Sequence, residues 1–226
     1  MRFLAAGLFL LIGAAPSAAA AQIKDGLAST LTSTAGSMAF RDRTLSPGWG
    51  MEAPDPLRDA RVAISSPRVA VGGLLRETLI LRGVRWSFGV GVASLPGEGA
   101  RVSGVTGGYE ARGRTPWAGL FDVSVGRQLR VGPVFPYIDA RASLSMVESR
   151  VELRSPTDGR LSVTGYQRSL VELGPRAGLW FPLGSTVHLD LSARAGLLGP
   201  ERFGIDLGLG FYLPFALPWN NRRRSS

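Results

Sequence analysis

The sequence contains no cysteine and only one histidine among its 226 residues. The absence of cysteine excludes disulfide bonds and thiolate metal sites. Lysine is nearly absent too, so the formal charge of +9 comes almost wholly from arginine, with Lys24 the exception. Proteins that bind nucleic acid usually gather their positive charge on one face. Here the arginines are spread along the chain among Asp and Glu, which argues against a nucleic-acid partner.

Long apolar runs are absent beyond the N-terminus. Arg2 precedes the apolar run 3–12, and the alanines at 19–21 provide an A-x-A cleavage site, so residues 1–21 are predicted to be a secretory signal peptide. A transmembrane helix needs about 18 consecutive apolar residues, which no segment supplies. A mature chain embedded in a membrane must therefore be a closed β-barrel, because only helices and closed barrels satisfy their backbone polar groups there.

Alternation of apolar and polar residues is clearest from 186 to 213. The apolar positions are Val187, Leu189, Leu191, Ala193, Ala195 and Leu197, then Phe203, Ile205, Leu207, Leu209, Phe211 and Leu213. The residues between them are charged, polar or glycine, and Gly199-Pro200 separates the two halves. A period of two predicts strands and Gly-Pro predicts a turn, so this region is a long hairpin with one apolar face.

The same pattern predicts eight strands, an even number and the smallest common size for an outer-membrane barrel. They cover 68–75, 84–94, 101–111, 117–127, 137–153, 163–181, 186–197 and 202–213. At Val147 the alternation changes phase, so either a β-bulge lies there or the strand leaves the membrane. The predicted domains are a periplasmic extension of low order at 22–60, the barrel at 61–214 and a tail at 215–226.

With a periplasmic N-terminus, the short periplasmic turns are expected at 95–99, 128–135 and 182–185. The outer ends are then expected at 76–83, 112–116, 154–162 and 198–201.

Alternation alone does not separate a membrane barrel from a secreted soluble barrel that binds a small apolar ligand. Glycine is frequent on the polar face, at Gly89, Gly91, Gly126, Gly174, Gly178, Gly208 and Gly210. A narrow lumen requires small residues, whereas a solvent-exposed face would carry Lys, Glu and Thr. Aromatic residues also gather at strand ends, as in the two aromatic girdles of a membrane barrel. Trp86, Tyr109, Trp117 and Phe203 are assigned to one rim, and Phe135, Tyr137, Trp180, Phe181, Phe211, Tyr212 and Phe215 to the other.

With these features the chain resembles the small eight-stranded outer-membrane β-barrel proteins of Gram-negative bacteria. The last predicted strand carries their insertion signal, a polar residue, then a glycine, then two spaced hydrophobic residues: Asp206, Gly208, Phe211 and Leu213. In the family this signal usually ends the chain, whereas residues 214–226 follow it here. The resemblance implies an all-β, antiparallel up-and-down barrel in the outer membrane, inserted by the barrel assembly machinery.

Charged residues of both signs fall on the predicted lumen face. They are Arg85, Asp122, Asp139, Arg141, Glu172, Arg176, Asp190, Arg194, Arg202 and Asp206. Buried charges must be paired, so a salt-bridge network that plugs the lumen is expected. The alternative is a narrow pore for small solutes.

His188, Asp190 and Ser192 share one strand face and raise the alternative of a lipid-modifying hydrolase. Neighbours at i,i+2 on a strand lie about 6.5–7 Å apart, whereas a general base must be within hydrogen-bond distance of its nucleophile. A histidine that fills the lumen is therefore preferred over a catalytic one. No HExxH, G-x-S-x-G or phosphate-binding loop is present, so no enzyme, cofactor or metal is expected.

The expected partners are outer-membrane lipid, the assembly machinery and lipopolysaccharide. Arginine suits phosphate recognition, and the predicted outer ends carry Arg76, Arg82, Arg112, Arg114, Arg154 and Arg160. The protein is expected to be a monomer with a structural or surface-interaction role.

Overall fold

The computed structural model describes residues 25–40, 43–64 and 68–215. The predicted signal peptide and all but the first residue of the predicted tail lie outside the described residues. The elements are β1 (Gly26–Met38), β2 (Arg43–Pro47), the 3-10 helix η1 (Asp55–Leu57), β3 (Arg61–Ile64), β4 (Arg68–Leu81), β5 (Val84–Ser94), β6 (Arg101–Ser103), β7 (Glu110–Gly113), β8 (Trp117–Gln128), β9 (Phe135–Arg154), β10 (Leu161–Pro182), β11 (Val187–Ala195) and β12 (Glu201–Pro214). Among these residues no helix is long and apolar enough to cross a membrane.

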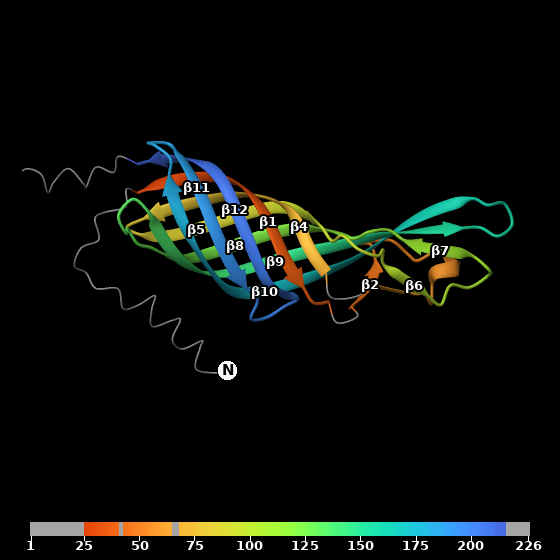
Figure 1. Ribbon diagram of the computed structural model, residues 1–226. Helices are drawn as coiled ribbons and strands as arrows, with labels where there is room; N and C mark the ends of the chain where they lie inside the picture. The colour runs from red at the N-terminus through yellow and green to blue at the C-terminus, as the bar shows by residue number, and fades with distance from the viewer. Residues whose placement is uncertain (1–24, 41–42, 65–67, 216–226) are drawn as a thin grey trace, which may run out of the picture.

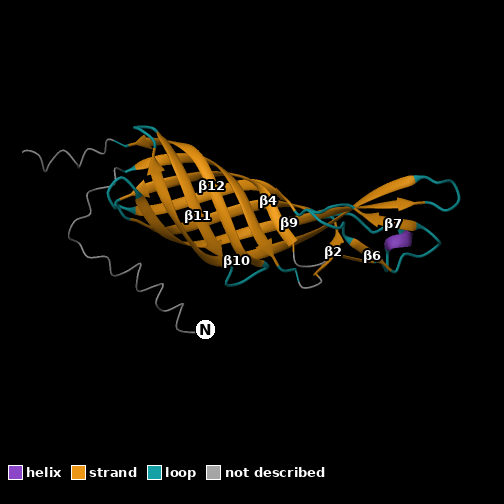
Figure 2. Ribbon diagram, in the orientation of Figure 1, coloured by secondary structure: helices purple, strands orange, loops and turns teal. Residues whose placement is uncertain are grey.

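Eight strands close into an antiparallel barrel (Figures 1 and 2). Their order is β1, β4, β5, β8, β9, β10, β11 and β12, and β12 pairs with β1 to complete the ring. Each strand pairs with its neighbour along the ring, so the predicted up-and-down barrel of eight strands is confirmed. Asp25 and Phe215 meet at one end through a backbone hydrogen bond of 2.6 Å, and we call this end the terminal end.

The structure corrects the predicted membership of the barrel at two places, one strand added and one removed. The prediction that 22–60 is a poorly ordered extension is wrong for β1, which pairs with β12 and β4 along its whole length. The predicted strand 101–111 is not part of the barrel, and its residues form β6, a loop and the start of β7 outside it. The two errors cancel in the count of eight.

Because β1 was not predicted, two connections were assigned to the wrong end of the barrel. The β4–β5 turn at Arg82-Gly83 lies at the terminal end, together with the turns at 129–134 and 183–186. Both turn residues have positive φ, 52° and 77°, the combination that a two-residue type I′ hairpin requires. The segment 95–99, predicted to be a periplasmic turn, lies at the opposite end.

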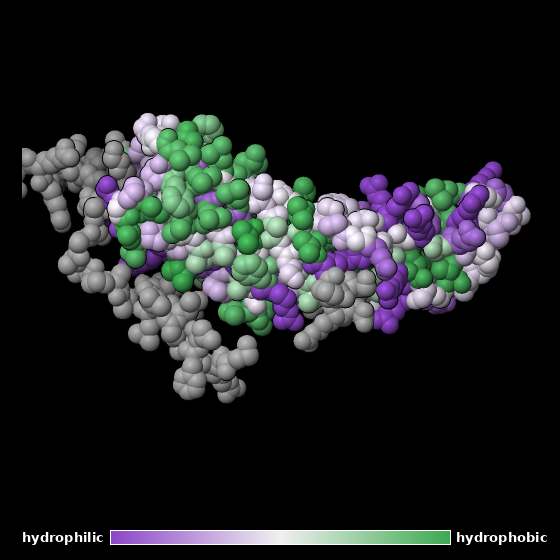
Figure 3. All heavy atoms as spheres, in the orientation of Figure 1, coloured by the Kyte–Doolittle hydropathy of each residue, from purple (hydrophilic) through white to green (hydrophobic). Residues whose placement is uncertain are grey.

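The barrel has the inverse polarity of a soluble protein. Large apolar side chains are exposed on its outer wall, including Phe88, Phe121, Val171, Leu207 and Phe211, and Figure 3 shows hydrophobic residues over the barrel strands. Charged side chains fill the inside, where Arg76, Arg85 and Arg176 are among the largest fully buried residues. Exposing this much apolar surface to water would be unfavourable. The wall therefore faces lipid, and the soluble-barrel alternative is excluded.

A narrow β extension projects from the end opposite the termini (Figure 1). It consists of β2, η1, β3, β6, β7 and the parts of β9 and β10 between Val147 and Arg168, which pair with each other. Its inside is an apolar cluster that includes Phe40, Leu57 and Leu153. Strand β9 alternates without a register shift through Val147. A β-bulge at Val147 is therefore excluded. The other predicted explanation holds, and the strand leaves the membrane at Val147.

Candidate functional site

The lumen holds nearly all of the predicted charged residues. Nine of the ten point inward and have side chains at most 9% exposed: Arg85, Asp122, Asp139, Arg141, Glu172, Arg176, Asp190, Arg194 and Asp206. They come from β5, β8, β9, β10, β11 and β12, because strict alternation along each strand places every second residue inside.

Arg202 is the exception and is exposed. The β1–β12 register shifts between Ser37 and Met38, so that Ser37 pairs with Phe203 and Met38 with Glu201. This bulge reverses the side-chain direction in the first residues of β12. Glu201 therefore occupies the lumen, at 4% exposed, in place of Arg202. Alternation of residue types carries no signal for such a bulge.

Arg76 belongs to the lumen although the sequence analysis assigned it to an outer end. Its side chain is 1% exposed and lies 3.1 Å from Asp206 and 3.6 Å from Asp122. The sequence contains the signal for this position. Arg76 has the opposite parity to the outward residues Val71 and Leu75, so extending the predicted strand to its true end at Leu81 would have placed Arg76 inside.

One half of the network, toward the terminal end, centres on Arg176. Its guanidinium lies 2.5 Å from Asp139 and 3.6 Å from Asp122. Arg85 lies 3.9 Å from Asp139 and 3.7 Å from Asp190. The two arginines thus share Asp139. The carboxylates and guanidinium groups of this half are all buried.

The other half, toward the extension, centres on Glu201. Arg141 and Arg194 each lie 2.6 Å from one of its carboxylate oxygens. Arg194 also pairs with Asp206, and Arg141 lies 3.7 Å from Glu172. Arg141 further pairs with Asp122 and so joins the two halves. The whole is one ion-pair network, as expected for buried charges that must be compensated.

Glycine on the inner wall makes room for these large groups. A Cβ added at Gly178 would lie 2.6 Å from the Tyr137 hydroxyl, and one at Gly204 would lie 2.5 Å from Nε of Arg194. The glycine-rich polar face noted in the sequence therefore reflects a crowded lumen.

Aromatic side chains close the lumen at the terminal end. Tyr137, Trp180 and Tyr212 are buried there and Phe135 packs against them. The rings of Trp180 and Tyr212 meet edge to face at 5.2 Å between centroids. All four residues are predicted from the sequence to lie in an outward girdle. Tyr137, Trp180 and Tyr212 instead have the parity of the lumen residues and form an inner plug.

Two other aromatic assignments differ as well. Trp86 pairs with Leu79 near the Arg82-Gly83 turn and so lies at the terminal end rather than with Trp117. Tyr109 packs against the core of the extension.

The apolar core of the extension reaches the other mouth of the lumen. Met38, Ala118, Val147 and Leu170 project inward where their strands leave the barrel, and all four belong to that core. Between this core and the ion-pair network remains a cavity of about 30 Å³, room for one or two water molecules. Among the described residues, buried side chains therefore lie on both sides of the ion-pair network.

His188 is fully buried, and its Nε2 lies 2.9 Å from Oγ1 of Thr30, over Gly210 of the strand between them. Its ring also packs on Trp180, with centroids 4.9 Å apart. The predicted trio does not form a relay, because Asp190 accepts a hydrogen bond from Tyr137 instead. The Thr30–His188 pair resembles a nucleophile with its base, and both side chains are buried.

The arginines expected at the outer ends do not form one cluster. Arg76 is in the lumen and Arg82 is at the terminal end. The other four lie on the extension, where Arg114 pairs with Glu152 at 2.6 Å and Arg160 with Asp158 at 3.2 Å. At that hairpin tip, hydrogen bonds from Ser155 and from the backbone N–H of Arg160 lower the pKa of the Asp158 carboxyl.

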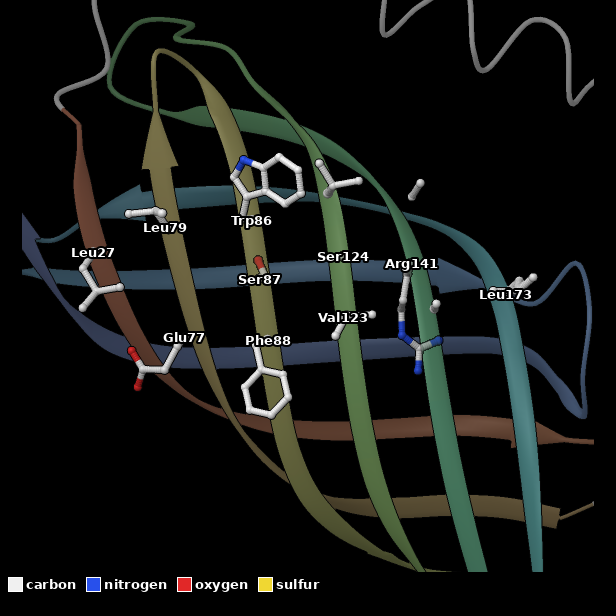
Figure 4. Close-up of a pocket in the computed structure, with 13 residues that line it drawn as sticks. Leu27, Glu77, Leu79, Trp86, Ser87, Phe88, Val123, Ser124, Arg141 and Leu173 are labelled. Atoms are coloured by element: carbon white, nitrogen blue, oxygen red, sulfur yellow. The ribbon is translucent and has the colours of Figure 1, made fainter.

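The outer wall has a shallow hollow of about 620 Å³ over strands β1 to β10 (Figure 4). Its lining is mostly apolar and includes Leu27, Leu79, Trp86 and Phe88 around the Glu77 carboxylate. Its polar members besides Glu77 are Ser87, Ser124 and Arg141. In a bilayer this hollow is filled by acyl chains.

The predicted insertion signal lies on β12, the strand that closes the ring. Phe211 and Leu213 are exposed on the outer wall, and Gly208 and Asp206 face the lumen. Recognition by the assembly machinery stays a prediction.

No protein-family profile and no curated protein sequence matches the chain. Among solved structures it is similar to Neisserial surface protein A, at 13% identity and a TM-score of 0.43, covering 83% of this chain and 97% of that one. It is similar to Ail, the attachment invasion locus protein of Yersinia pestis, at 15% identity and 0.39, covering 84% and 99%. A major outer membrane protein from Thermus thermophilus is similar at 13% identity and 0.39, covering 82% and 99%.

The fold assignment rests on this chain's own geometry. The ring of hydrogen-bonded strands has no open edge, its wall is apolar outside and its charges are inside. These are the properties of a transmembrane barrel of the outer-membrane type.

Proposed function

We propose that the protein is a non-conducting outer-membrane anchor that holds a rigid β extension at the cell surface, in a structural or surface-interaction role. The observation that supports this proposal is that buried side chains occupy the lumen at three levels. They are the ion-pair network at its centre, the aromatic cluster at the terminal end and the core of the extension at the other end. We propose that these three groups together plug the lumen.

The location of the extension follows from the lengths of the connections. Bacterial outer-membrane barrels have short periplasmic turns and longer extracellular loops. The turns at the terminal end are short, whereas the segments between β1 and β4 and between β5 and β8 contain all the short strands of the extension. The terminal end is therefore periplasmic and the extension is extracellular.

The extension offers an exposed surface for contacts outside the cell. Trp49 is 94% exposed, and Met51, Leu161 and Val163 are also more than half exposed. The backbone N–H of Gly48 donates to Gly165 at 2.9 Å, which brings the loop bearing Trp49 beside β10. Exposed tryptophan is enriched at interaction hot spots. Arg112 and Arg154 on the same extension remain candidates for contact with lipopolysaccharide phosphates.

Planar-bilayer recording distinguishes a non-conducting anchor from a narrow pore for small solutes. The full barrel, reconstituted at known density, should give no conductance above the lipid background, while a porin control in the same chamber conducts. Steps that scale with protein density would refute the proposal and favour the narrow pore.

Turnover of phospholipid and lipid A by the wild type and by His188→Ala tests the hydrolase alternative. The plugs predict that neither protein releases fatty acid. Release by the wild type that is lost in the variant would establish an enzyme and contradict the anchor.

A further inference from the structure

Glu77 is an ionisable residue on the lipid-facing wall of the barrel. Its side chain has the outward parity of Leu75 and Leu79 on β4. Outward charged residues on the other described barrel strands, such as Arg127 and Glu148, lie at the rims. Glu77 instead lies four residues before the end of β4, inside the apolar band. Ionisable residues in contact with lipid are costly and mark functional sites.

The carboxylate of Glu77 has few hydrogen-bond partners within the chain. The Ser29 hydroxyl, on the paired strand β1, donates to one of its oxygens at 2.6 Å. Among the described residues Ser29 is the one donor to this carboxylate. A carboxylate accepts several hydrogen bonds, and a charge removed from water requires a compensating charge. The group that complements Glu77 is therefore a cation that donates hydrogen bonds.

The hollow on the outer wall follows a single row of residues that starts at Glu77. Each member of this row is the register partner of the next, and all of them line the hollow (Figure 4): Glu77, Phe88, Val123, Ala142 and Leu173. The other polar lining residues have the parity of the lumen: Ser87, Ser124 and Arg141. On its lipid side the hollow is thus apolar except at its Glu77 end.

This row changes depth across the wall, because the strands of a membrane barrel are tilted by about 35–45°. Glu77 lies four residues from the terminal end of β4, whereas Leu173 lies nine residues from the terminal end of β10. The charged end of the hollow is therefore nearer to one face of the membrane, and its apolar end lies deeper in the bilayer. A phospholipid has the same arrangement, with its headgroup at the surface and its acyl chains directed inward.

We propose that the hollow binds a phospholipid whose headgroup is a primary ammonium, as in phosphatidylethanolamine. The ammonium supplies a positive charge and three N–H donors, and so completes the hydrogen bonding of Glu77 beside Ser29. An acyl chain lies along the row, where the small side chain of Ala142 leaves room. A choline headgroup has the charge without an N–H donor, and a phosphatidylglycerol headgroup is anionic. Neither supplies both the positive charge and the donors.

The depth of Glu77 also assigns this lipid to one leaflet. Glu77 lies toward the terminal end, which the proposed function places in the periplasm, so the lipid belongs to the periplasmic leaflet. The choice of leaflet rests on that proposed orientation, whereas the chemistry of binding does not.

Quenching of Trp86 reports the lipid in the hollow, because Trp86 lines it and is 55% exposed. The barrel is reconstituted in phosphatidylcholine vesicles that contain a guest phospholipid with brominated acyl chains, which quench tryptophan on contact. The guest is phosphatidylethanolamine, phosphatidylglycerol or phosphatidylcholine, each with the same chains. The difference between the wild type and Trp86→Phe isolates the signal of Trp86. Phosphatidylethanolamine should bind about tenfold more tightly than phosphatidylcholine, the effect of a hydrogen bond to a charged group.

Substitutions assign this preference to the carboxylate. Glu77→Gln keeps the shape of the side chain without its charge, and should bring the two affinities within about twofold of each other. Ser29→Ala keeps the carboxylate and should retain most of the preference. Leu207→Trp in the Trp86→Phe background places a tryptophan on β12, away from the hollow, and should show no preference. A gel shift on boiling shows that each variant is folded.

Equal quenching of Trp86 by the ethanolamine and choline lipids would overturn the proposal and leave interfacial water as the partner of Glu77. A preference that survives Glu77→Gln, or that is equally strong at Leu207→Trp, would also overturn it, because the preference would then belong to the whole barrel surface. Either failure would leave the non-conducting anchor intact, since this measurement depends neither on conductance nor on the orientation of the barrel.

Discussion

The barrel and the extension share β9 and β10, yet their polarity is opposite. In the barrel Ser143 and Ser145 of β9 point inward while Leu144 and Met146 point to lipid. In the extension Val151 and Leu153 point inward while Arg150 points to water. One uninterrupted alternation serves both regions, and only the identity of the residues on each face changes at Val147.

The difference shows that the solvent, not the strand, decides which face is apolar. In lipid, apolar side chains are favoured on the outside, and the polar groups inside must pair with each other. In water, polar side chains are favoured on the outside and apolar side chains inside. The change at Val147 therefore locates the membrane boundary, and the boundary divides the molecule into a region closed by ion pairs and a region closed by apolar packing.

The largest expected effect comes from breaking the ion-pair network. Arg176→Leu leaves Asp139 buried without its closest partner and removes one of the guanidinium groups around Asp122, which should lower the free energy of unfolding by about 3–5 kcal/mol. Urea unfolding of the barrel in vesicles, followed by tryptophan fluorescence, measures it. Arg154→Leu on the exposed face of the extension should change it by less than about 0.5 kcal/mol. Equal effects at the two arginines would contradict the division into two regions.

Removing apolar volume from the extension should unfold it without opening the barrel. Leu153 is 1% exposed in the core of the extension, and Leu153→Ala should cost about 2–5 kcal/mol of local stability. Limited proteolysis should then cut within 43–64 and 95–116, while the barrel keeps its gel shift on boiling. Leu144→Ala, on the lipid face of the same strand, should leave the cutting unchanged. Loss of the gel shift in Leu153→Ala would show that the two regions unfold together.

Two valines on the outer face of β10 allow the same substitution to be compared in lipid and in water. Val171 is 64% exposed on the barrel wall, and Val163 is 54% exposed on the extension. Val171→Arg should destabilise the folded protein by about 2–4 kcal/mol, because the guanidinium enters the lipid-facing band. Val163→Arg should have an effect within about 0.5 kcal/mol. A small effect at Val171 in the same urea titration would move the membrane boundary toward the terminal end.

Strand β1 shows where sequence reasoning failed. Its inward residues include Thr30, Thr32 and Thr34, and its outward residues include Ser29 and Ser33. The outward face mixes these serines with Leu27 and Leu31, so the alternation of hydropathy is weak there. Its place in the ring is decided by pairing with β12 and β4, which are distant in sequence.

The lumen was more predictable because its residues follow the parity of well-marked strands. The sequence identified Asp122, Asp139 and Arg176 as lumen residues from their alternation with apolar neighbours. It did not show which carboxylate pairs with which guanidinium, because those contacts join strands far apart in the chain. It also could not show the β12 bulge that brings Glu201 inside and leaves Arg202 outside.

The sequence by itself determined the class of fold and the inverted polarity of the wall, because both follow from residue types repeating every second position. The tertiary structure alone decided ring membership, the plugs and the extension, because each depends on which distant strands pair. A local pattern fixes which way a side chain points relative to its own strand, and only closure of the ring fixes what it meets there.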